Sequence, residues 1–500
     1  MELRGLGDAG LARALIFPGR SPRGLALAAL VAVTLLRLAV AAAAPIAPDE
    51  AYYWVWSRAL AAGYPDHPPM VALWCRLGTA VVGNSALGIR LVGSLAIAVA
   101  SLLVVEAGNR LLSGRGTGLR AALLLNATLL FGVGGVLLTP DAPLLVFWCA
   151  ALWSLARLVD SGDPRWWLVT GVCAGLALAS KYTAALLWFG IAIWLMITPA
   201  GRQWLRRPAP WLGAILGSLV VLPVVLWEAR HGWVSMARQG GRIGDWHAVE
   251  GLRFLGELLA GQIGLATPLV FLLCAAGVVM VARAAWLSKD STSILLAALT
   301  LPGVVLFTEH ALGARVQGNW PAVIYPAAAL AAGGLRSSIW RRMVPFAVAI
   351  GLTMTGAIYL QATIRPFPLP VRLDPIARQL EGWDGLAARV VDRSIGADFI
   401  ASDQYGLAAK LALTMQTGPR VVSVDGRWST TDLPRTSIAG QVGLLINDAP
   451  MTGRPVNPAW SSITEAGLVA RRLGDETIAT YWLYRVTGAA GAEAVLMPRP

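Results

Sequence analysis

The sequence contains little charge for its length. Of its 500 residues, 14% are charged and 56% are hydrophobic, whereas soluble globular proteins average roughly 25% charged residues. This shortage excludes an ordinary soluble domain. Apolar runs recur through about residue 362, and 21 tryptophans supply side chains that favour membrane interfaces. The composition therefore predicts a polytopic α-helical membrane protein.

Cysteine, histidine and lysine are also scarce. The four cysteines lie at positions 75, 149, 173 and 274, and no two of them form a CxxC pair. None lies in the C-terminal region, which excludes a disulfide framework there and a cysteine-based metal motif. The chain has only four histidines and three lysines, because arginine fills nearly every other basic position.

Nucleotide-binding motifs are absent as well. The sequence has no P-loop, and no GxGxxG that opens a helix after a strand. The net charge is +13, but residues 370–500 hold 13 basic and 13 acidic residues, so the excess lies in the apolar part. Basic loops that fix membrane topology explain this pattern better than nucleic-acid binding, and no nucleic-acid partner is expected.

The apolar runs predict about 11–13 transmembrane helices. The run 25–44 is about 20 residues long, and a cleaved signal peptide has an apolar core of only about 7–15 residues, so we interpret it as a retained first helix. Residues 69–82 form a shorter piece that suits an interfacial or re-entrant helix. The expected spans lie at about 25–44, 87–109, 119–138, 142–158, 166–180, 183–199, 210–228, 257–282, 292–308, 320–334 and 343–362.

Charged residues sort onto two sides of these spans. Arginines recur in short loops on one side, which the positive-inside rule assigns to the cytoplasm. All four histidines and several loop acids fall on the other side. We expect a cytoplasmic N-terminus at 1–24, a transmembrane part at 25–365 whose first external loop is 45–86, and an external domain at 366–500. Any chemistry is then expected to face away from the cytoplasm.

The C-terminal region has a different sequence pattern from the rest. Residues 420–426 and 477–486 are β-branched and aromatic, as strands are, and residues 403–416 show helical spacing. The pattern predicts a small α/β domain outside the membrane.

The first external loop carries two acidic clusters among aromatic residues. Asp49 and Glu50 follow the first span; each is a candidate catalytic residue, as a general base or an electrostatic partner, and the structural alternative is a pair of acids in the first turn of an interfacial helix. In GYPDHPP, three prolines fix a turn that aims Asp66 and His67. This pair suits a substrate contact, a structural pair, or a divalent cation completed by His231 or His247, since a metal site needs three or four ligands.

Two external helix ends supply further candidates. Asp141 in TPDAP is either an N-cap or a catalytic acid that faces the same cavity as Asp49. Lys181 in ASKYTA suits a phosphate as a compact point charge, or else extends its amine to the membrane surface. The same external loops hold the remaining candidate substrate-binding residues, which are Tyr53, Tyr64, Tyr182, His231, Arg238, Arg242, Glu309 and Asn319.

Six motifs occur in an order that resembles a known enzyme family. They are DEAYYWVWSRALAAGYPDHPP, LLTPDAPL, GLALASKYTA, PVVLWEARHGWVSMARQ, GNWPAVIYPAA and SDQYGLAAKLAL. They resemble the motifs of family 39/83-type glycosyltransferases, which have the GT-C fold. Relatives of these enzymes include protein O-mannosyltransferases, the lipid A aminoarabinose transferase and rhizobial galacturonosyltransferases. The similarity covers about residues 25–435.

The resemblance implies an inverting glycosyltransferase of the bacterial inner membrane. Such enzymes take a sugar from a polyprenyl-phosphate carrier on the outer face of that membrane, and attach it to a lipid, glycan or protein. Asp49 matches the family's first-loop acid, the catalytic base, and Asp141 matches its second-loop acid. Lys181 matches a basic residue that meets the carrier phosphate. Asp66 and His67 occupy a pair that reads Glu-Lys in the aminoarabinose enzymes, and the histidine departs from that pattern.

Two other functions fit a polar external cavity. A transporter or flippase for a lipid-linked sugar would share the cavity, but it should carry ionisable residues near the middle of the membrane. Arg37 and Glu106 are the main residues of that kind. A non-catalytic subunit of a glycan-assembly complex is the third interpretation, and the presence together of Asp49, Asp66, Asp141 and Lys181 argues against it.

Overall fold

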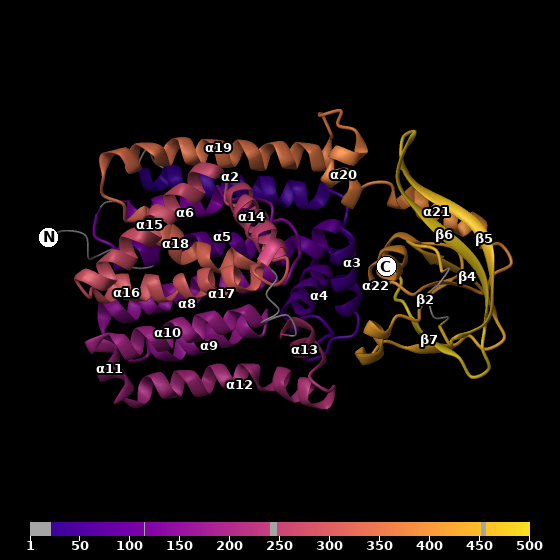
Figure 1. Cartoon of the computed structure of the whole chain (residues 1–500), viewed down its shortest axis with the longest axis horizontal. Helices are drawn as coiled ribbons and strands as arrows, with labels where there is room; N and C mark the ends of the chain where they lie inside the picture. Colours follow the sequence, from indigo (N-terminus) through magenta and orange to yellow (C-terminus); the bar gives the residue numbers. More distant parts are fainter. Residues whose placement is uncertain (1–21, 115, 241–247, 452–456) are drawn as a thin grey trace.

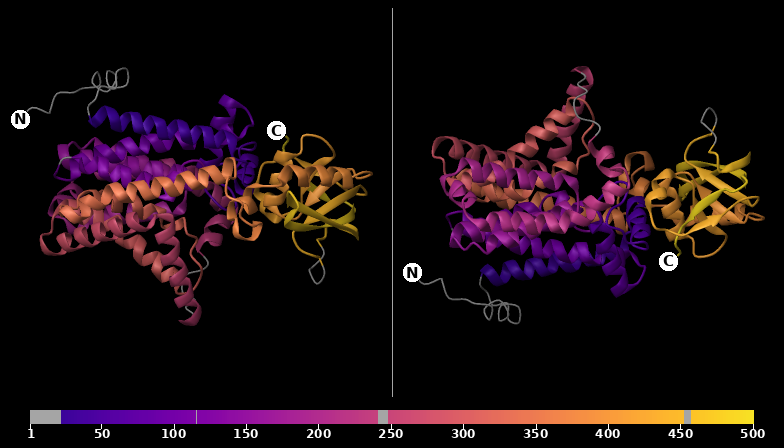
Figure 2. Two further views of the ribbon diagram at one scale, coloured as in Figure 1. Left: turned by 90° about the horizontal axis from the view of Figure 1, so that it is seen from above. Right: turned by 90° about the horizontal axis from the view of Figure 1, so that it is seen from below.

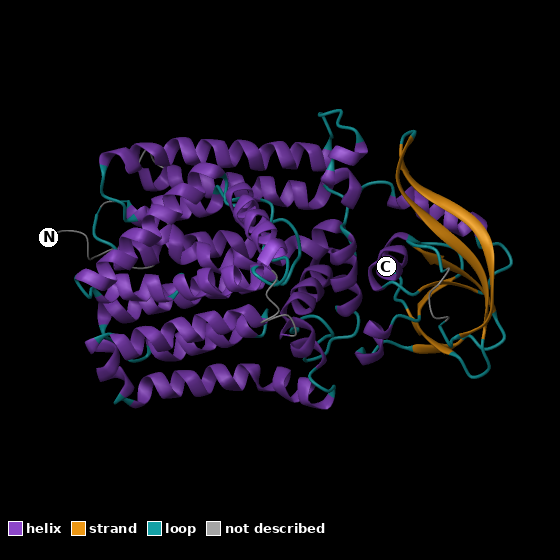
Figure 3. Cartoon of the chain, in the orientation of Figure 1, coloured by secondary structure: helices purple, strands orange, loops and turns teal. Residues whose placement is uncertain are grey.

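The computed structural model describes residues 22–114, 116–240, 248–451 and 457–500. The chain forms a bundle of helices that is followed by a C-terminal region with strands (Figure 1; Figure 3). The long helices of the bundle run side by side, and the C-terminal region covers one end of them (Figure 2). The fold is therefore a helical membrane part capped by a mixed α/β region.

Seven helical segments in the described ranges are long and apolar enough to cross a membrane. The number is eight if the helices on either side of Thr198, which meet at a bend of 105°, form one span. The expected fold class, a polytopic helical membrane protein, is confirmed. The seven are α2 (Pro22–Ala43), α5 (Ala86–Leu111), α8 (Asp141–Ser161), α12 (Pro208–Arg230), α15 (Pro268–Leu287), the pair α16 (Ser291–Ala298) and α17 (Leu301–Ala311), and α19 (Ser338–Thr363).

By length and composition, these seven or eight spans replace the expected 11–13, because several apolar runs form short or broken helices. The expected span 119–138 breaks after Asn126, where the Thr128 hydroxyl accepts a hydrogen bond from the Phe131 N–H and starts a new helix. Another expected span breaks at Thr267, which has a φ of +66° and precedes Pro268. The shorter helices of the bundle are α3 (Pro48–Trp56), α4 (Met70–Val82), α6 (Thr117–Asn126), α7 (Leu129–Gly132), α9 (Trp166–Leu178), η1 (Tyr182–Ala184), α10 (Ala185–Ile197), α11 (Pro199–Leu205), α13 (Val234–Gly240), α14 (Ala248–Leu265), η2 (Trp320–Ile324) and α18 (Tyr325–Gly333).

Small residues let α9 and α12 approach closely. A Cβ atom placed on Gly171 would lie 1.9 Å from the carbonyl oxygen of Gly213, and one on Gly175 would lie 2.5 Å from that of Gly217. Glycine at these positions removes the side chains that would separate the two helices, as is common between membrane helices.

The C-terminal region is built on a seven-stranded sheet with the order β3-β7-β2-β1-β4-β6-β5. The central strand β1 pairs in parallel with β2 and β4, and the outer pairs are antiparallel. The predicted strands and helix of this region are therefore present. The strands are β1 (Phe399–Ser402), β2 (Arg420–Ser423), β3 (Arg435–Ser437), β4 (Val442–Asn447), β5 (Trp460–Leu473), β6 (Glu476–Gly488) and β7 (Glu493–Leu496), and the helices are η3 (Val371–Leu373), α20 (Pro375–Leu380), α21 (Trp383–Arg393), α22 (Tyr405–Thr414) and η4 (Gly426–Thr430).

Helix α22 of this region packs against α3 of the bundle (Figure 1). The buried Lys410 on α22 donates a hydrogen bond of 2.7 Å from Nζ to the carbonyl oxygen of Ile46, just before α3 begins. The Tyr405 and Tyr52 rings lie 4.5 Å apart across the same contact. These contacts hold the C-terminal region against the helix that carries the first acidic pair of the external loop.

Candidate active site

Helix α3 presents two adjacent acids in opposite environments. The chain enters the helix through Pro48, so Asp49 and Glu50 both lie in its first turn, where acids suit the helix dipole. Asp49 is exposed, whereas Glu50 retains only 1% of its accessible surface. Successive residues of a helix point about 100° apart, which sends one acid outward and the other into the bundle.

The carboxylate of Glu50 is fully occupied by hydrogen bonds. Its Oε1 accepts from Arg90 Nε at 2.7 Å and from the Leu138 N–H at 3.0 Å, and its Oε2 accepts from Arg90 Nη2 at 2.6 Å and from the Ala47 N–H at 3.0 Å. Burial alone would raise the pKa of Glu50, but the charge and hydrogen bonds of Arg90 outweigh it and lower that pKa. No lone-pair direction of this carboxylate is left for a reacting proton.

Arg90 connects the end of α2 to α3 and α5. It is 0% exposed, and it also donates to the carbonyl oxygens of Ala41, Ala44 and Pro45 at 3.1, 2.7 and 2.8 Å. A buried ion pair needs such extra hydrogen bonds to offset its desolvation. The Glu50–Arg90 pair therefore acts as a structural centre that fixes where α3 begins.

Asp49 faces a second, open cluster of charges. Protein atoms packed around its carboxyl group raise the pKa of Asp49, the negative charges of Glu50 and Asp66 raise it further, and Arg427 lowers it. The buried Tyr53 ring lies within electrostatic reach of three acids: burial raises its pKa well above the ordinary value, and the charges of Asp49, Asp141 and Asp66 add to this effect. The charges of three carboxylates thus act on one tyrosine.

Asp141 and Lys181 form a buried ion pair beside this tyrosine. The Lys181 Nζ lies 2.7 Å from Asp141 Oδ1, and Asn319 Nδ2 donates to Asp141 Oδ2. Asp141 begins α8, Lys181 precedes η1 and Asn319 precedes η2. Three segments that are distant in sequence therefore meet at this pair.

The carboxylate of Asp66 joins three parts of the molecule. Its Oδ1 accepts from Arg238 on α13 at 2.9 Å, while its Oδ2 accepts from the Tyr52 hydroxyl at 2.8 Å and from Arg427 of the C-terminal region at 3.3 Å. Burial raises the pKa of Asp66, but the hydrogen bond from Arg238, the charge of Arg427 and the bond from Tyr52 outweigh it and lower the pKa. Asp66 is therefore an ionised carboxylate that holds Arg238, Tyr52 and Arg427 together.

His67 is a neutral neighbour of these charges. Burial and the positive charge of Lys181 lower the pKa of His67 to about 4, against the raising effects of Asp66 and Asp141. Its Nδ1 is buried and has no hydrogen-bond partner among the described residues. Nor is a metal-binding group of three His, Cys, Asp or Glu residues found in the described part of the chain, so Asp66, His67 and His231 do not come together as metal ligands.

Other predicted substrate-binding residues already have protein partners. The Tyr64 ring stacks on Trp56, and its hydroxyl donates toward the Trp56 and Ala59 carbonyls. The hydroxyl of Tyr182 donates to the buried Glu228 at 2.9 Å. His231 stacks on the Trp227 ring, and its Nδ1 lies 2.8 Å from that residue's carbonyl oxygen.

The last two predicted residues of this group are Glu309 and Arg242. Glu309 lies near the end of α17, whose following segment supplies Asn319. Arg242 lies outside the described residues, as does His247.

The structure adds site residues that the sequence patterns did not single out. Arg427 approaches Asp66, and its guanidinium lies 4.0 Å from the centre of the Tyr405 ring. Burial and the charge of Asp49 raise the pKa of Tyr405, so this ring also faces the open cluster. Tyr405 lies in SDQYGLAAKLAL, one of the six motifs that resemble the enzyme family. That motif indicated that the C-terminal region belongs to the resemblance. Nothing in the local sequence distinguishes Arg427 or Arg90 from other arginines.

Comparison with known proteins gives one family match and consistent relatives. Residues 66–227 match the family described as dolichyl-phosphate-mannose-protein mannosyltransferase. The chain is 29% identical over 384 residues to the lipid A galacturonosyltransferase RgtD of Rhizobium johnstonii, which covers 74% of this chain and 77% of that protein. The fold matches the crystal structure of ArnT from Cupriavidus metallidurans bound to undecaprenyl phosphate, with a TM-score of 0.63 and 14% identity over 93% of this chain and 98% of that one. The apo form of ArnT gives the same values.

Proposed function

Because this chain is a membrane-embedded glycosyltransferase of the GT-C type, we propose that it transfers a sugar from a polyprenyl-phosphate carrier to lipid A or a related lipid. The ArnT structure contains undecaprenyl phosphate, and RgtD is named for lipid A. Both matches extend over most of this chain, which supports the carrier and the acceptor in the proposal. Glycan and protein acceptors are the alternatives that the experiment below separates.

Asp49 is the proposed general base. The residue is exposed, and its carboxyl group has a raised pKa and lies within electrostatic reach of Asp66, Arg427 and Tyr405. A base whose pKa is raised toward the working pH takes a proton more effectively in the transition state. Glu50 cannot take this role while Arg90 and two backbone N–H groups occupy its oxygens, so we assign it to structure.

In the proposed reaction, an acceptor hydroxyl attacks the anomeric carbon of the carrier-bound sugar. The bond from this carbon to the phosphate oxygen breaks as the new glycosidic bond forms, so the configuration inverts. The hydroxyl proton passes to Asp49, and the electron pair leaves with the polyprenyl phosphate. The departing phosphate gains negative charge, which a nearby cation stabilises.

Lys181 is the proposed cation for the departing phosphate. Asp141 and Asn319 fix the position of its amine, because they form one connected group with it. A lysine amine has three donor directions, so the bond to Asp141 leaves two for phosphate oxygens. Arg238 and Arg427 lie at the other side of the cluster and are shared with Asp66. We assign both arginines to contacts with the carrier and the sugar, which would compete with Asp66 for the two guanidinium groups.

The proposed site faces the periplasm of a bacterial inner membrane. The acid cluster lies at the end of the bundle that the C-terminal region covers, and the loops around α11 and α16 lie at the other end (Figure 1). Those loops carry Arg202, Arg206, Arg207 and Lys289. The positive-inside rule places such loops in the cytoplasm, which puts the acid cluster and the C-terminal region outside.

The single observation that carries the proposal is that the exposed Asp49 and the Lys181-paired Asp141 both act electrostatically on the buried Tyr53. A transporter for a lipid-linked sugar receives less support, because the two ionisable residues noted within spans have local partners. Arg37 donates to Asn126 at 2.9 Å, and Glu106 binds Arg110 and Arg157 at 2.9 and 2.8 Å.

Mass spectrometry of envelope lipids tests the proposal. Lipid A, the lipopolysaccharide core, other glycans and envelope proteins are compared between cells with the gene, cells without it, and cells that express Asp49→Asn. We expect lipid A to lose the mass of one sugar in the last two strains. A mass loss confined to glycan or protein would show that this molecule, and not lipid A, is the acceptor. Unchanged envelopes in both strains would overturn the proposed function.

A further inference from the structure

A groove between α6 and α19 opens toward the lipid at the arginine-rich end of the bundle. It has a volume of about 440 Å³, and its lining combines Arg120 and Arg341 with the apolar side chains of Leu123, Val344 and Val348. Helices α6 and α19 pack against each other, and both begin at this end (Figure 1). The groove is far from the acid cluster, which lies at the opposite end of the bundle (Figure 1).

The charged end of the groove is suited to an anion. Arg341 is exposed, and no ion pair between described residues involves it. Arg120 is oriented by the Gly333 carbonyl oxygen, which accepts from its Nε at 3.1 Å and its Nη2 at 2.9 Å. The groove is therefore lined by two guanidinium groups at its charged end.

The apolar end of the groove has the direction and length of a lipid chain. Val344 and Val348 follow Arg341 along α19, and an α-helix rises about 1.5 Å per residue. The groove therefore extends roughly 10 Å from the arginine level into the bilayer. Ala349 leaves the wall of the groove open, because it has only a methyl side chain and is exposed.

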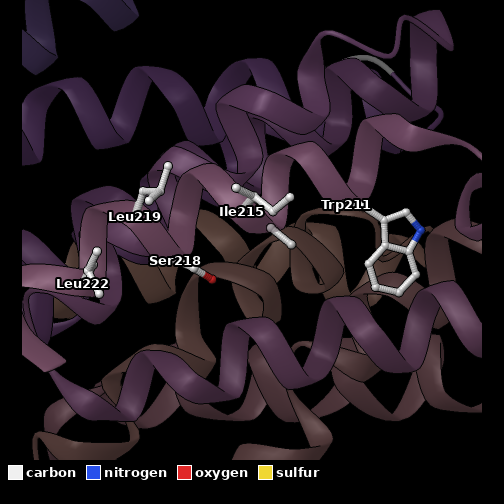
Figure 4. Close-up of a pocket in the computed structure, with 6 residues that line it drawn as sticks. Trp211, Ile215, Ser218, Leu219 and Leu222 are labelled. Atoms are coloured by element: carbon white, nitrogen blue, oxygen red, sulfur yellow. The ribbon is translucent and has the colours of Figure 1, made fainter.

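A second lipid-facing groove provides an internal contrast. It has a volume of about 320 Å³ and lies along α12, where Trp211, Ile215, Ser218 and Leu222 line it (Figure 4). No charged side chain lines it. Such a surface accommodates acyl chains of any phospholipid, so it offers no selection by headgroup.

We propose that the α6–α19 groove is a binding site for an acidic phospholipid of the adjacent leaflet. The two arginines bind the headgroup phosphates, and Leu123, Val344 and Val348 contact the upper part of one acyl chain. Basic pockets between membrane helices on the cytoplasmic side bind such headgroups in other proteins. The site stands apart from the proposed transferase reaction and does not depend on it.

Native mass spectrometry of the purified full-length protein tests this site. The protein is incubated with an equimolar mixture of cardiolipin and phosphatidylethanolamine, and the fraction of protein that retains each lipid is measured. The variants are Arg341→Gln, which removes one charge, and Ala349→Trp, which fills the groove without changing the charge. Arg283→Gln is the matched control, since Arg283 is an exposed arginine in the last turns of α15, at the same end of the bundle.

We expect the wild-type protein to retain cardiolipin in preference to phosphatidylethanolamine. Arg341→Gln should lower cardiolipin retention about five-fold, which is the contribution of one arginine near an acidic lipid surface. Ala349→Trp should lower it at least as much, and Arg283→Gln should leave it unchanged. Equal retention of both lipids by the wild type, or equal losses in Arg283→Gln and Arg341→Gln, would overturn the proposal.

Discussion

Two charge clusters lie on either side of α3, and they differ in whether their carboxylates are free to react. In the cluster of Glu50 and Arg90, every carboxylate oxygen has two donors and both side chains are buried. In the cluster around Tyr53, Asp49 is exposed and its pKa is raised. The contrast teaches that acidity at a membrane face does not by itself mark a catalytic residue. In the proposed site, the fully hydrogen-bonded Glu50 belongs to the scaffold, and the exposed Asp49 with its raised pKa is the proposed base.

The largest expected effect comes from the buried cluster. Glu50→Ala should destabilise the protein by about 3–5 kcal/mol, because it leaves the charge of Arg90 buried and unpaired. Thermal unfolding of the purified protein in detergent measures this loss. The control is Glu106→Gln, which removes a carboxylate from a half-exposed ion pair and should cost about 1 kcal/mol or less. A Glu50→Ala protein with normal stability and no transfer would instead make Glu50 catalytic.

Acid should weaken the same cluster. The pKa of Glu50 is lower in the folded protein than its ordinary value of 4.5. Its stabilising contribution is therefore complete above the pKa of the unfolded chain and is lost as the pH falls through the folded pKa. The acid-induced loss of stability should be smaller in Glu50→Gln than in the wild type.

The next largest effect is expected at Lys181. Lys181→Met should lower the rate of sugar transfer by about 10²–10³-fold, as the loss of one donor to a developing charge does in other enzymes. Rates of transfer from a polyprenyl-phosphate sugar measure this effect, with thermal unfolding as a check on folding. Lys289→Met is a matched control, because Lys289 is an exposed lysine at the opposite end of the bundle. Equal effects of the two substitutions would contradict the role of Lys181.

A smaller effect concerns the pH dependence of the open cluster. The unprotonated form of Asp49 is the proposed base, so activity should fall as the pH drops through its raised pKa. The charge of Asp66 raises that pKa and the charge of Arg427 lowers it. Asp66→Asn should therefore move the acid limb of kcat/KM to lower pH, and Arg427→Gln should move it to higher pH. Shifts in the same direction would show that the limb belongs to another group.

The smallest effect is expected at Tyr64. Its hydroxyl contacts backbone groups of its own loop, and its ring stacks on Trp56 at 4.3 Å. Tyr64→Phe keeps the stacked ring, so the transfer rate should stay within about three-fold and the stability should fall by about 1 kcal/mol. A drop in transfer comparable to that of Lys181→Met would restore Tyr64 as a substrate contact.

The sequence predicted the membrane fold and the side on which the acids gather, because hydropathy and arginine placement are local properties of the chain. It also placed Asp141 and Lys181 at external helix ends, and the structure pairs these two residues directly. It did not predict the number of full spans, because breaks such as the one at Thr267 depend on backbone conformation within an apolar run.

Contacts with residues distant in sequence give the adjacent acids Asp49 and Glu50 their different environments. Whether Asp49 or Glu50 is buried depends on Arg90, which lies 40 residues from Glu50 on another helix. The contact between Asp66 and Arg427 joins residues 361 positions apart and requires the C-terminal region to dock on α3. Neither contact leaves a periodic or local pattern, so composition and motif spacing cannot reveal it.

The most direct test compares transfer with carrier binding in Asp49→Asn. Purified wild-type and variant proteins are loaded with a labelled polyprenyl-phosphate sugar, lipid A is added, and label in carrier and acceptor is followed through one turnover. We predict that the variant binds the carrier and unfolds at the wild-type temperature, but transfers sugar at least about 100-fold more slowly. A variant that transfers sugar within about ten-fold of the wild-type rate would contradict the assignment of the open cluster to chemistry.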